Sequence, residues 1–152
     1  MSEPTVFIVD DDDACRDSVR ELVIAVGLTA AVFSSGFEFL AAFDGTWRGC
    51  LVLDVRMPRM EGVALQQRLI EMGARLPIVF VSGSVDIETA GQAIRDGAVD
   101  FLEKPYRQQQ LLDAIYTALR RDSASRQEHG ELRQGQSALD LHCANAYPAA
   151  RG

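Results

Sequence analysis

Acidic side chains follow two apolar segments of this sequence. Residues 6–9 run directly into four consecutive aspartates that begin at Asp10, and a second apolar segment ends on Asp54. Mutual repulsion and desolvation disfavour such a cluster of carboxylates beside buried segments unless a cation compensates their charge. Oxygen ligands select a hard cation, and Mg²⁺ commonly takes one or two carboxylates and leaves a position open for a phosphate oxygen. The pattern therefore predicts a Mg²⁺ site in which Asp10 and Asp11 lie opposite Asp54.

A carboxylate at such a site can also act as a nucleophile and form an aspartyl phosphate. Asp54 is the best candidate, because it stands alone at the end of its segment while Asp10 and Asp11 can hold the metal. Phosphoryl transfer requires mainly positioning and neutralisation of the phosphoryl oxygens. Lys104 offers a compact cation and Ser82 a hydroxyl donor, each at the end of a further apolar segment. The sequence thus predicts a phosphoryl-transfer site.

The elements that must position these residues alternate regularly along the chain. Short apolar segments of strand type are separated by segments whose apolar residues recur three or four positions apart, as in amphipathic helices. The expected strands are residues 6–9, 28–33, 50–54, 77–82 and 99–104. Such alternation predicts an α/β fold, a doubly wound five-stranded parallel sheet with helices on both faces. Ligands of such folds bind beyond the carboxyl ends of the strands, where the candidate residues lie.

Length and composition predict one folded domain followed by a tail. The 152 residues, 47% hydrophobic, are enough for one core and contain no apolar run that could span a bilayer. The N-terminus lacks the pattern of a signal peptide, and the three cysteines are too far apart for a disulfide framework or a metal site. We therefore expect a cytoplasmic protein without a membrane segment. The net charge of −7 disfavours direct binding of nucleic acid.

The regular pattern ends near Asp122. Beyond it, glycines at positions 130 and 135 disfavour a helix, and Pro148 and several alanines close the chain. The interpretation is a folded domain over residues 1–122 and a flexible tail over residues 123–152. An extension of the last helix into that tail is left open.

Four motifs in this order resemble the receiver domain of two-component response regulators. They are VDDD after the first strand, LDVRMPRMEG around Asp54, VSGS after the fourth strand and FLEKP at the fifth. The resemblance extends from Thr5 to Arg121. It implies the flavodoxin-like strand order 2-1-3-4-5 and transfer of a phosphoryl group from a sensor histidine kinase to the chain. The segment GAVDFLEKP is most similar to the FixJ-like branch, whose members carry a DNA-binding output domain.

The resemblance also assigns roles at the metal site. Asp54 would be the phospho-acceptor and a ligand of the Mg²⁺ cofactor, and Asp11 would bind the ion directly. Asp10 would bind it directly or through water, and the backbone carbonyl of Arg56 would be a further ligand. Of the other aspartates in the run, Asp12 or its neighbour is expected to cap the following helix.

For switching, the resemblance implies that Ser82 and Lys104 move toward the phosphoryl oxygens. Phe101, the switch aromatic, would then pack inward. Independently of switching, the resemblance implies that the peptide bond before Pro105 is cis. The surface of the fourth helix, fifth strand and fifth helix would change as a result. That surface is the expected contact for a downstream protein or for a second copy of the chain.

Other functions are less compatible with the sequence. A flavin binder with the same sheet order needs a neutral phosphate loop where this chain has four aspartates. An aspartyl phosphatase usually has a second carboxylate two residues after its nucleophile, and position 56 is Arg. We therefore expect no enzyme beyond self-phosphorylation and slow self-dephosphorylation. Three alternatives stay open: a single-domain regulator, a FixJ-like transcription factor whose output domain is absent, and an interaction module that is never phosphorylated.

Overall fold

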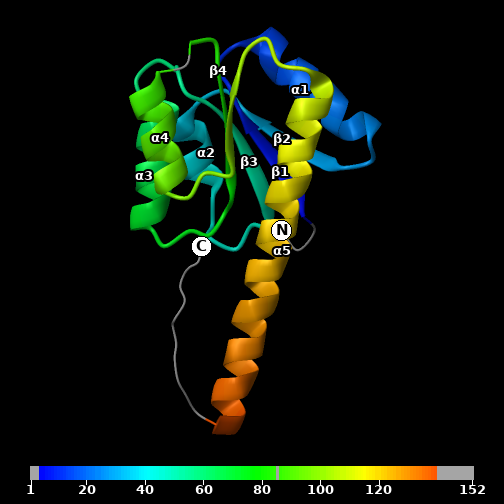
Figure 1. The fold of residues 1–152 in the computed structure, drawn as a ribbon, viewed down its shortest axis with the longest axis vertical. Coiled ribbons are helices and arrows are strands. Elements are labelled where there is room, and N and C mark those ends of the chain that lie inside the picture. The colour runs from blue at the N-terminus through cyan, green and yellow to red at the C-terminus, as the bar shows by residue number, and fades with distance from the viewer. Residues whose placement is uncertain (1–3, 85, 140–152) are drawn as a thin grey trace.

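The computed structural model describes residues 4–84 and 86–139, and for residues 127–139 only the course of the backbone. Five strands and five helices alternate strictly over this part of the chain, as predicted (Figure 1). They are β1 (Thr5–Val9), α1 (Asp13–Ala25), β2 (Thr29–Phe33), α2 (Gly36–Ala42), β3 (Gly49–Asp54), α3 (Gly62–Glu71), β4 (Ile78–Ser82), α4 (Ile87–Arg95), β5 (Asp100–Glu103) and α5 (Gln108–Leu139).

The strands form one parallel sheet in the order β2-β1-β3-β4-β5, which confirms the predicted fold class and strand order. The three inner strands β1, β3 and β4 are buried along their whole length. The edge strands β2 and β5 are partly exposed. Continuous apolar sequences are therefore found where helices cover both faces of the sheet.

Helices cover the sheet on two sides (Figure 1). Successive side chains of a strand point to opposite faces, so β1 and β3 contribute to two separate cores. One core contains Phe39 of α2 and Leu65 of α3, together with part of α4. The other contains Val23 of α1 and Ile115 of α5. The carboxyl edge of the sheet between these two layers is left for the polar residues.

The turn from β1 into α1 follows the sequence prediction. Asp12 is the N-cap of α1, and its carboxylate accepts hydrogen bonds from the backbone of Ala14 at 2.9 Å and of Cys15 at 3.2 Å. Such a cap satisfies backbone N–H groups that have no partner within the helix. One of the four aspartates is therefore needed for local structure, while the preceding two remain at the strand end.

The spacing of Ile87, Ala90 and Ile94 predicts a helix here, and α4 is present, but Ile87 and Ile94 do not form its buried face. Ile87 is 86% exposed and Ile94 is also exposed, whereas the buried residue of this helix is Ala93. Gln66 of α3 donates a hydrogen bond to the Ala93 carbonyl at 3.1 Å. α3 therefore covers the face of α4 that contains Ala93, and the larger side chains of Ile87 and Ile94 lie outside this contact.

α5 extends past Asp122, where the sequence predicted the folded domain to end. The extension of the last helix that the sequence left open is present, since the chain is helical to Leu139, and the expectation that glycines 130 and 135 disfavour a helix is wrong for this stretch. Glycine in a helix costs only about 1 kcal/mol relative to alanine, far less than proline. Residues 140–152 of the predicted tail lie outside the described residues, so the domain boundary and the flexibility of the tail stay predictions.

As far as Arg126, α5 contacts the first residue of β3 and the loop that leads into it. Asp122 is 2% exposed, and its carboxylate accepts a hydrogen bond from the backbone of Gly49 at 2.8 Å. Arg126 pairs with Asp122 at 3.0 Å and also donates to the carbonyl of Trp47.

In the part of the chain that the structure describes, no helix combines the length and apolar character needed to cross a membrane.

Candidate functional site

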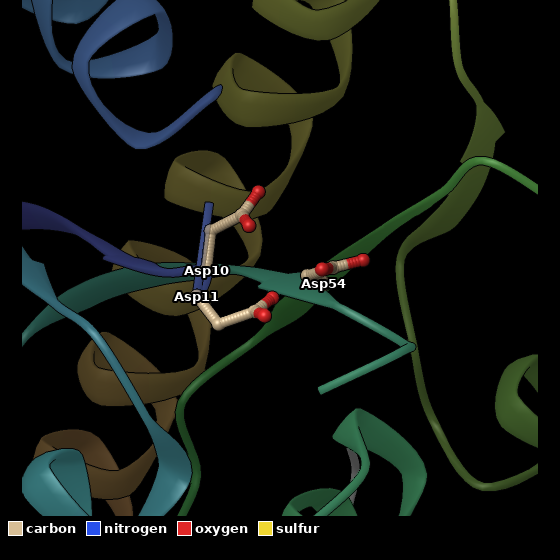
Figure 2. Close-up of side chains that lie close together, drawn as sticks. All are labelled: Asp10, Asp11 and Asp54. Atoms are coloured by element: carbon tan, nitrogen blue, oxygen red, sulfur yellow. The ribbon is translucent and has the colours of Figure 1, made fainter. Parts of the chain in front are cut away.

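The polar site lies at the carboxyl ends of β1 and β3. Val9 is paired with Leu53 in the parallel register, so the next residues, Asp10 and Asp54, are brought to the same level of the sheet. Oxygen atoms of Asp10, Asp11 and Asp54 lie within 4.8 Å of one another (Figure 2). The sheet therefore gathers the three carboxylates that the sequence selected.

The three carboxylates differ in their environment. Asp10 is buried, and its two oxygens accept hydrogen bonds from the backbone of Asp12 at 2.9 Å and from Lys104 Nζ at 3.3 Å. Asp11 is exposed, and its carboxylate accepts no hydrogen bond from the described residues. Asp54 is buried beside them. Asp10 is thus held by the protein, while Asp11 is available to an external ligand.

Lys104 brings a positive charge to this cluster from the loop after β5. Its Nζ lies 3.3 Å from Asp10 Oδ2, 3.9 Å from Asp54 Oδ1 and 3.6 Å from Cys15 Sγ. Partial burial lowers the pKa of Lys104, but the carboxylates of Asp10 and Asp54 more than offset this, so the net shift is upward. The Lys104–Pro105 peptide bond is cis, which confirms the prediction made from the resemblance.

The pKa of Asp54 is raised to about 6. Burial is the main cause, and the negative charge of Asp10 adds to it, while Lys104 offsets only part of the shift. One lysine therefore does not neutralise the acidic cluster. The three side chains offer only carboxylate oxygens as metal ligands, and the exposed carboxylate of Asp11 is accessible to an ion. Such a set of ligands fits a hard divalent cation such as Mg²⁺.

The predicted switch residues are not bonded to the acceptor. Ser82 ends β4 and is fully buried, and its hydroxyl donates to the Ser84 carbonyl at 2.7 Å and accepts from the Ser84 backbone at 3.1 Å. Phe101 on β5 is half-buried, with its ring centroid 5.7 Å from that of Phe80. Ser82 and Phe101 thus lie on the two strands beyond Asp54, and their switch roles stay predictions.

Arg56 follows Asp54 in the loop to α3. Its backbone N–H donates to Asp54 Oδ1 at a long 3.4 Å, and its side chain is exposed. Its carbonyl as a metal ligand stays a prediction.

Sequence reasoning missed two residues that shape the site. A Cβ atom at Gly62 would lie 2.4 Å from the Asp54 carbonyl oxygen, so only glycine allows α3 to begin this close to the acceptor. Arg16 donates a hydrogen bond to the Asp10 carbonyl at 2.8 Å. The only sequence signal for Arg16 was a basic residue three positions after Asp13, a spacing that brings side chains together on a helix.

Comparison with known proteins points to one family. The family model described as the response regulator receiver domain matches residues 6–116. The response regulator protein TmoT of Ectopseudomonas mendocina is 47% identical over 118 residues, which cover 78% of this chain and 54% of that protein. The transcriptional regulatory protein TdiR of Thauera aromatica is 45% identical over 137 residues, which cover 90% of this chain and 59% of that protein.

Solved structures give the same result. The response regulator StyR superposes with a TM-score of 0.83 at 39% identity, over 91% of this chain and 71% of that chain. The structure of FixJ-N has a TM-score of 0.72 at 35% identity, over 79% of this chain and 96% of that one. The chain spans little more than half the length of the curated relatives TmoT and TdiR.

Proposed function

Because the chain belongs to the response regulator receiver domain family, we propose that it accepts a phosphoryl group on Asp54 from a sensor histidine kinase. Receiver domains of response regulators are the phosphorylated partners of such kinases in two-component systems. The observation that carries the proposal is the cluster of Asp10, Asp11 and Asp54 within 4.8 Å of one another, with Lys104 at its edge.

The chemistry is an in-line transfer of a phosphoryl group from the donor atom to the Asp54 carboxylate. An oxygen of the Asp54 carboxylate attacks the phosphorus of a phosphohistidine or small acyl phosphate. The bond from phosphorus to the donor atom breaks, its electron pair stays on the donor, and Asp54 becomes an acyl phosphate. With a pKa of about 6, Asp54 is mostly ionised at pH 7 and can act as a nucleophile.

The acidic residues around Asp54 would hold the cofactor. Asp11, Asp54 and the carbonyl of Arg56 are the proposed Mg²⁺ ligands, with Asp10 bound directly or through water. Bound Mg²⁺ would neutralise charge on the carboxylate and on the phosphoryl oxygens. Lys104, which lies beside Asp10 and Asp54, would supply a second positive charge to the phosphorylated form.

Phosphorylation would then change a distant surface. The Ser82 hydroxyl leaves Ser84 and donates to a phosphoryl oxygen, Lys104 follows the new charge, and Phe101 packs inward. This is a population shift, driven by contacts that exist only with the phosphoryl group. The surface of α4, β5 and α5 would receive a downstream protein or a second copy of the chain. The exposure of Ile87 and Ile94 on α4 supports an apolar contact there.

The role that we propose for the protein is that of a signal transducer, and not of an enzyme that acts on external substrates. Receiver domains are typically such transducers. Arg56 occupies the place where an aspartyl phosphatase would carry its general acid, so the chain catalyses only its own phosphorylation and slow dephosphorylation. Its proposed location is the cytoplasm, without direct contact with nucleic acid or membrane.

A second candidate is the receiver part of a longer, FixJ-like transcription factor. It is supported by the relatives, because TdiR is named a transcriptional regulatory protein and this chain spans 59% of it. The DNA-binding output domain of such a factor would lie outside this sequence. An interaction module that is never phosphorylated is less well supported, since Asp54, Lys104 and the acidic pair are all present.

Labelling with a radioactive acyl phosphate in Mg²⁺ tests the function. The unmodified chain should form an acid-stable, base-labile adduct, and Asp54→Asn should form none, because the amide cannot attack phosphorus. Asp17→Asn, which changes an exposed aspartate on α1, is the matched control and should label normally. Undiminished labelling of Asp54→Asn would refute Asp54 as the acceptor.

A further inference from the structure

We propose that Arg16 is a positioning residue for the metal site: its guanidinium holds the turn between β1 and α1 in the conformation that presents Asp11 to a divalent cation. The inference rests on the proposed function, since it concerns the same acidic cluster. It assigns a role to a side chain that touches neither the acceptor nor Lys104 in the described contacts.

Arg16 joins the two ends of the acidic run. It lies in the first turn of α1, and its side chain is only 15% exposed. Nη1 donates to the backbone carbonyl of Asp10 at 2.8 Å, and Nη2 pairs with the exposed carboxylate of Asp13. The planar fork of a guanidinium can reach two acceptors with one side chain, which an ammonium cannot do in a fixed geometry. Arg16 therefore closes a small loop around Asp11 and Asp12.

The bond to the Asp10 carbonyl acts directly on Asp11. The carbonyl of Asp10 and the nitrogen of Asp11 belong to the same planar peptide unit, so fixing the oxygen fixes the direction in which the chain enters Asp11. The Asp11 carboxylate accepts no hydrogen bond from the described residues. The backbone is therefore what orients this side chain toward Asp54.

Loss of Arg16 would leave the Asp10 carbonyl without this donor in a place where Asp10 itself is buried. A buried acceptor without a donor is costly, so the peptide unit would turn to find another partner. Side chains that orient metal ligands without touching the metal typically contribute about 10- to 100-fold to metal affinity. We expect an effect of this size for Arg16.

Charge and positioning predict opposite results at this residue. Arg16 is a cation close to a site for another cation, so its charge alone weakens Mg²⁺ binding. If charge were its only effect, neutralising Arg16 would tighten the binding of Mg²⁺. If Arg16 positions Asp11, the same substitution loosens it. The sign of the change in Kd therefore separates the two explanations.

The experiment measures Mg²⁺ binding to the full chain by isothermal titration calorimetry and by the Mg²⁺-induced rise in melting temperature. The variants are Arg16→Gln, Arg16→Lys and, as a charge control, Arg20→Gln, which changes an exposed arginine one turn further along α1. We expect Kd to rise about 10-fold or more in Arg16→Gln. Arg16→Lys should also bind more weakly than the unmodified chain, because it keeps the charge but not the fork. Arg20→Gln should bind equally well or slightly more tightly.

Each result bears on one claim. Binding by Arg16→Gln that equals or exceeds that of the unmodified chain overturns the positioning role, as does unchanged binding by Arg16→Lys. If Arg16→Gln does not fold, judged by far-ultraviolet circular dichroism, Arg16→Lys decides alone. Failure of the unmodified chain to bind Mg²⁺ would instead overturn the metal site of the proposed function, and this inference with it.

Discussion

The two ends of β3 carry two buried aspartates with different environments. At the amino end, Asp122 of α5 is 2% exposed and contacts Gly49, the first residue of the strand. At the carboxyl end, Asp54 is 6% exposed and is the last residue of the strand. The sites are equally removed from water, yet only one resembles a reactive site. Burial by itself therefore does not make a carboxylate a nucleophile.

The difference lies in how the oxygens are satisfied. Asp122 accepts one hydrogen bond from the Gly49 backbone at 2.8 Å and two from Arg126 Nε, at 3.1 Å and 3.0 Å. Asp54 has only long contacts, with the Arg56 backbone at 3.4 Å and with Lys104 at 3.9 Å. A carboxylate whose partners are already in place stabilises the fold, whereas one with weak partners stays available to a metal ion and to phosphorus.

The largest expected effect is the loss of folding stability when Asp122, whose carboxylate oxygens all have hydrogen-bond donors, is replaced. Asp122→Ala should lower the free energy of unfolding by about 3 kcal/mol, because it leaves Arg126 and the Gly49 N–H without their acceptor. Denaturation by urea measures this. Asp113→Ala, at an exposed aspartate of the same helix, should change stability by less than about 0.5 kcal/mol. Equal effects of the two substitutions would contradict the structural role of Asp122.

At the carboxyl end of β3, replacing the buried aspartate Asp54 is expected to raise the stability of the fold. The folded state raises the pKa of Asp54 to about 6 from its ordinary value of 3.8, mainly because the carboxyl is buried. Ionisation of Asp54 therefore costs stability as the pH rises through about 6, and this cost is absent below about pH 4. In metal-free buffer at pH 7, Asp54→Asn should be more stable than the unmodified chain by about 2 kcal/mol, because the raised pKa makes ionisation of Asp54 costly and nearby water screens part of that cost.

Unfolding curves recorded from pH 4 to pH 8 check this expectation. The difference between Asp54→Asn and the unmodified chain should grow with pH and level off above about pH 7. Titrating groups that do not interact with Asp54 cancel in this difference. If the difference in unfolding free energy stayed constant from pH 4 to pH 8, the pKa of Asp54 would not be raised in the folded protein.

The smallest expected effect concerns the stability gained from Mg²⁺. A ligand present at ten times its Kd stabilises a protein by about 1.4 kcal/mol. The unmodified chain should gain about this much, and Asp11→Ala should lose most of the gain, because it removes a ligand and a negative charge. Asp17→Ala removes the same charge from an exposed position on α1 and should keep most of it. Equal melting shifts in the two variants would remove Asp11 from the metal site.

Much of the fold and of the candidate site could be predicted from the sequence, because the signals are local. The unbroken apolar sequences of β1, β3 and β4 reflect burial on both faces. In a parallel sheet the carboxyl ends of the strands share one edge, and the strand order implied by the family resemblance makes β1 and β3 neighbours, so Asp10 and Asp54 were expected to meet. Asp12 as a helix cap follows from the same local reasoning.

Predictions failed where the deciding contact joins distant parts of the chain. Periodicity located α4 but not its buried face, which depends on the approach of α3 to Ala93. Asp122 was predicted only as the last residue of the folded domain, and its burial depends on its contact with Gly49, 73 positions away. Arg16 had no predicted role, and only its side-chain bond to the Asp10 carbonyl, six positions earlier, connects it with the site.

The sequence by itself determined which residue types stand at the end of each strand, since backbone periodicity and the choice of polar residue are properties of neighbouring positions. Only the tertiary structure decided how each of these charges is compensated. The free energy of a buried carboxylate depends on donors within a few ångströms, and one donor of each carboxylate, Gly49 for Asp122 and Lys104 for Asp54, comes from an element far away in the chain. For this reason Asp54 and Asp122, both aspartates buried beside β3, differ in what they can do.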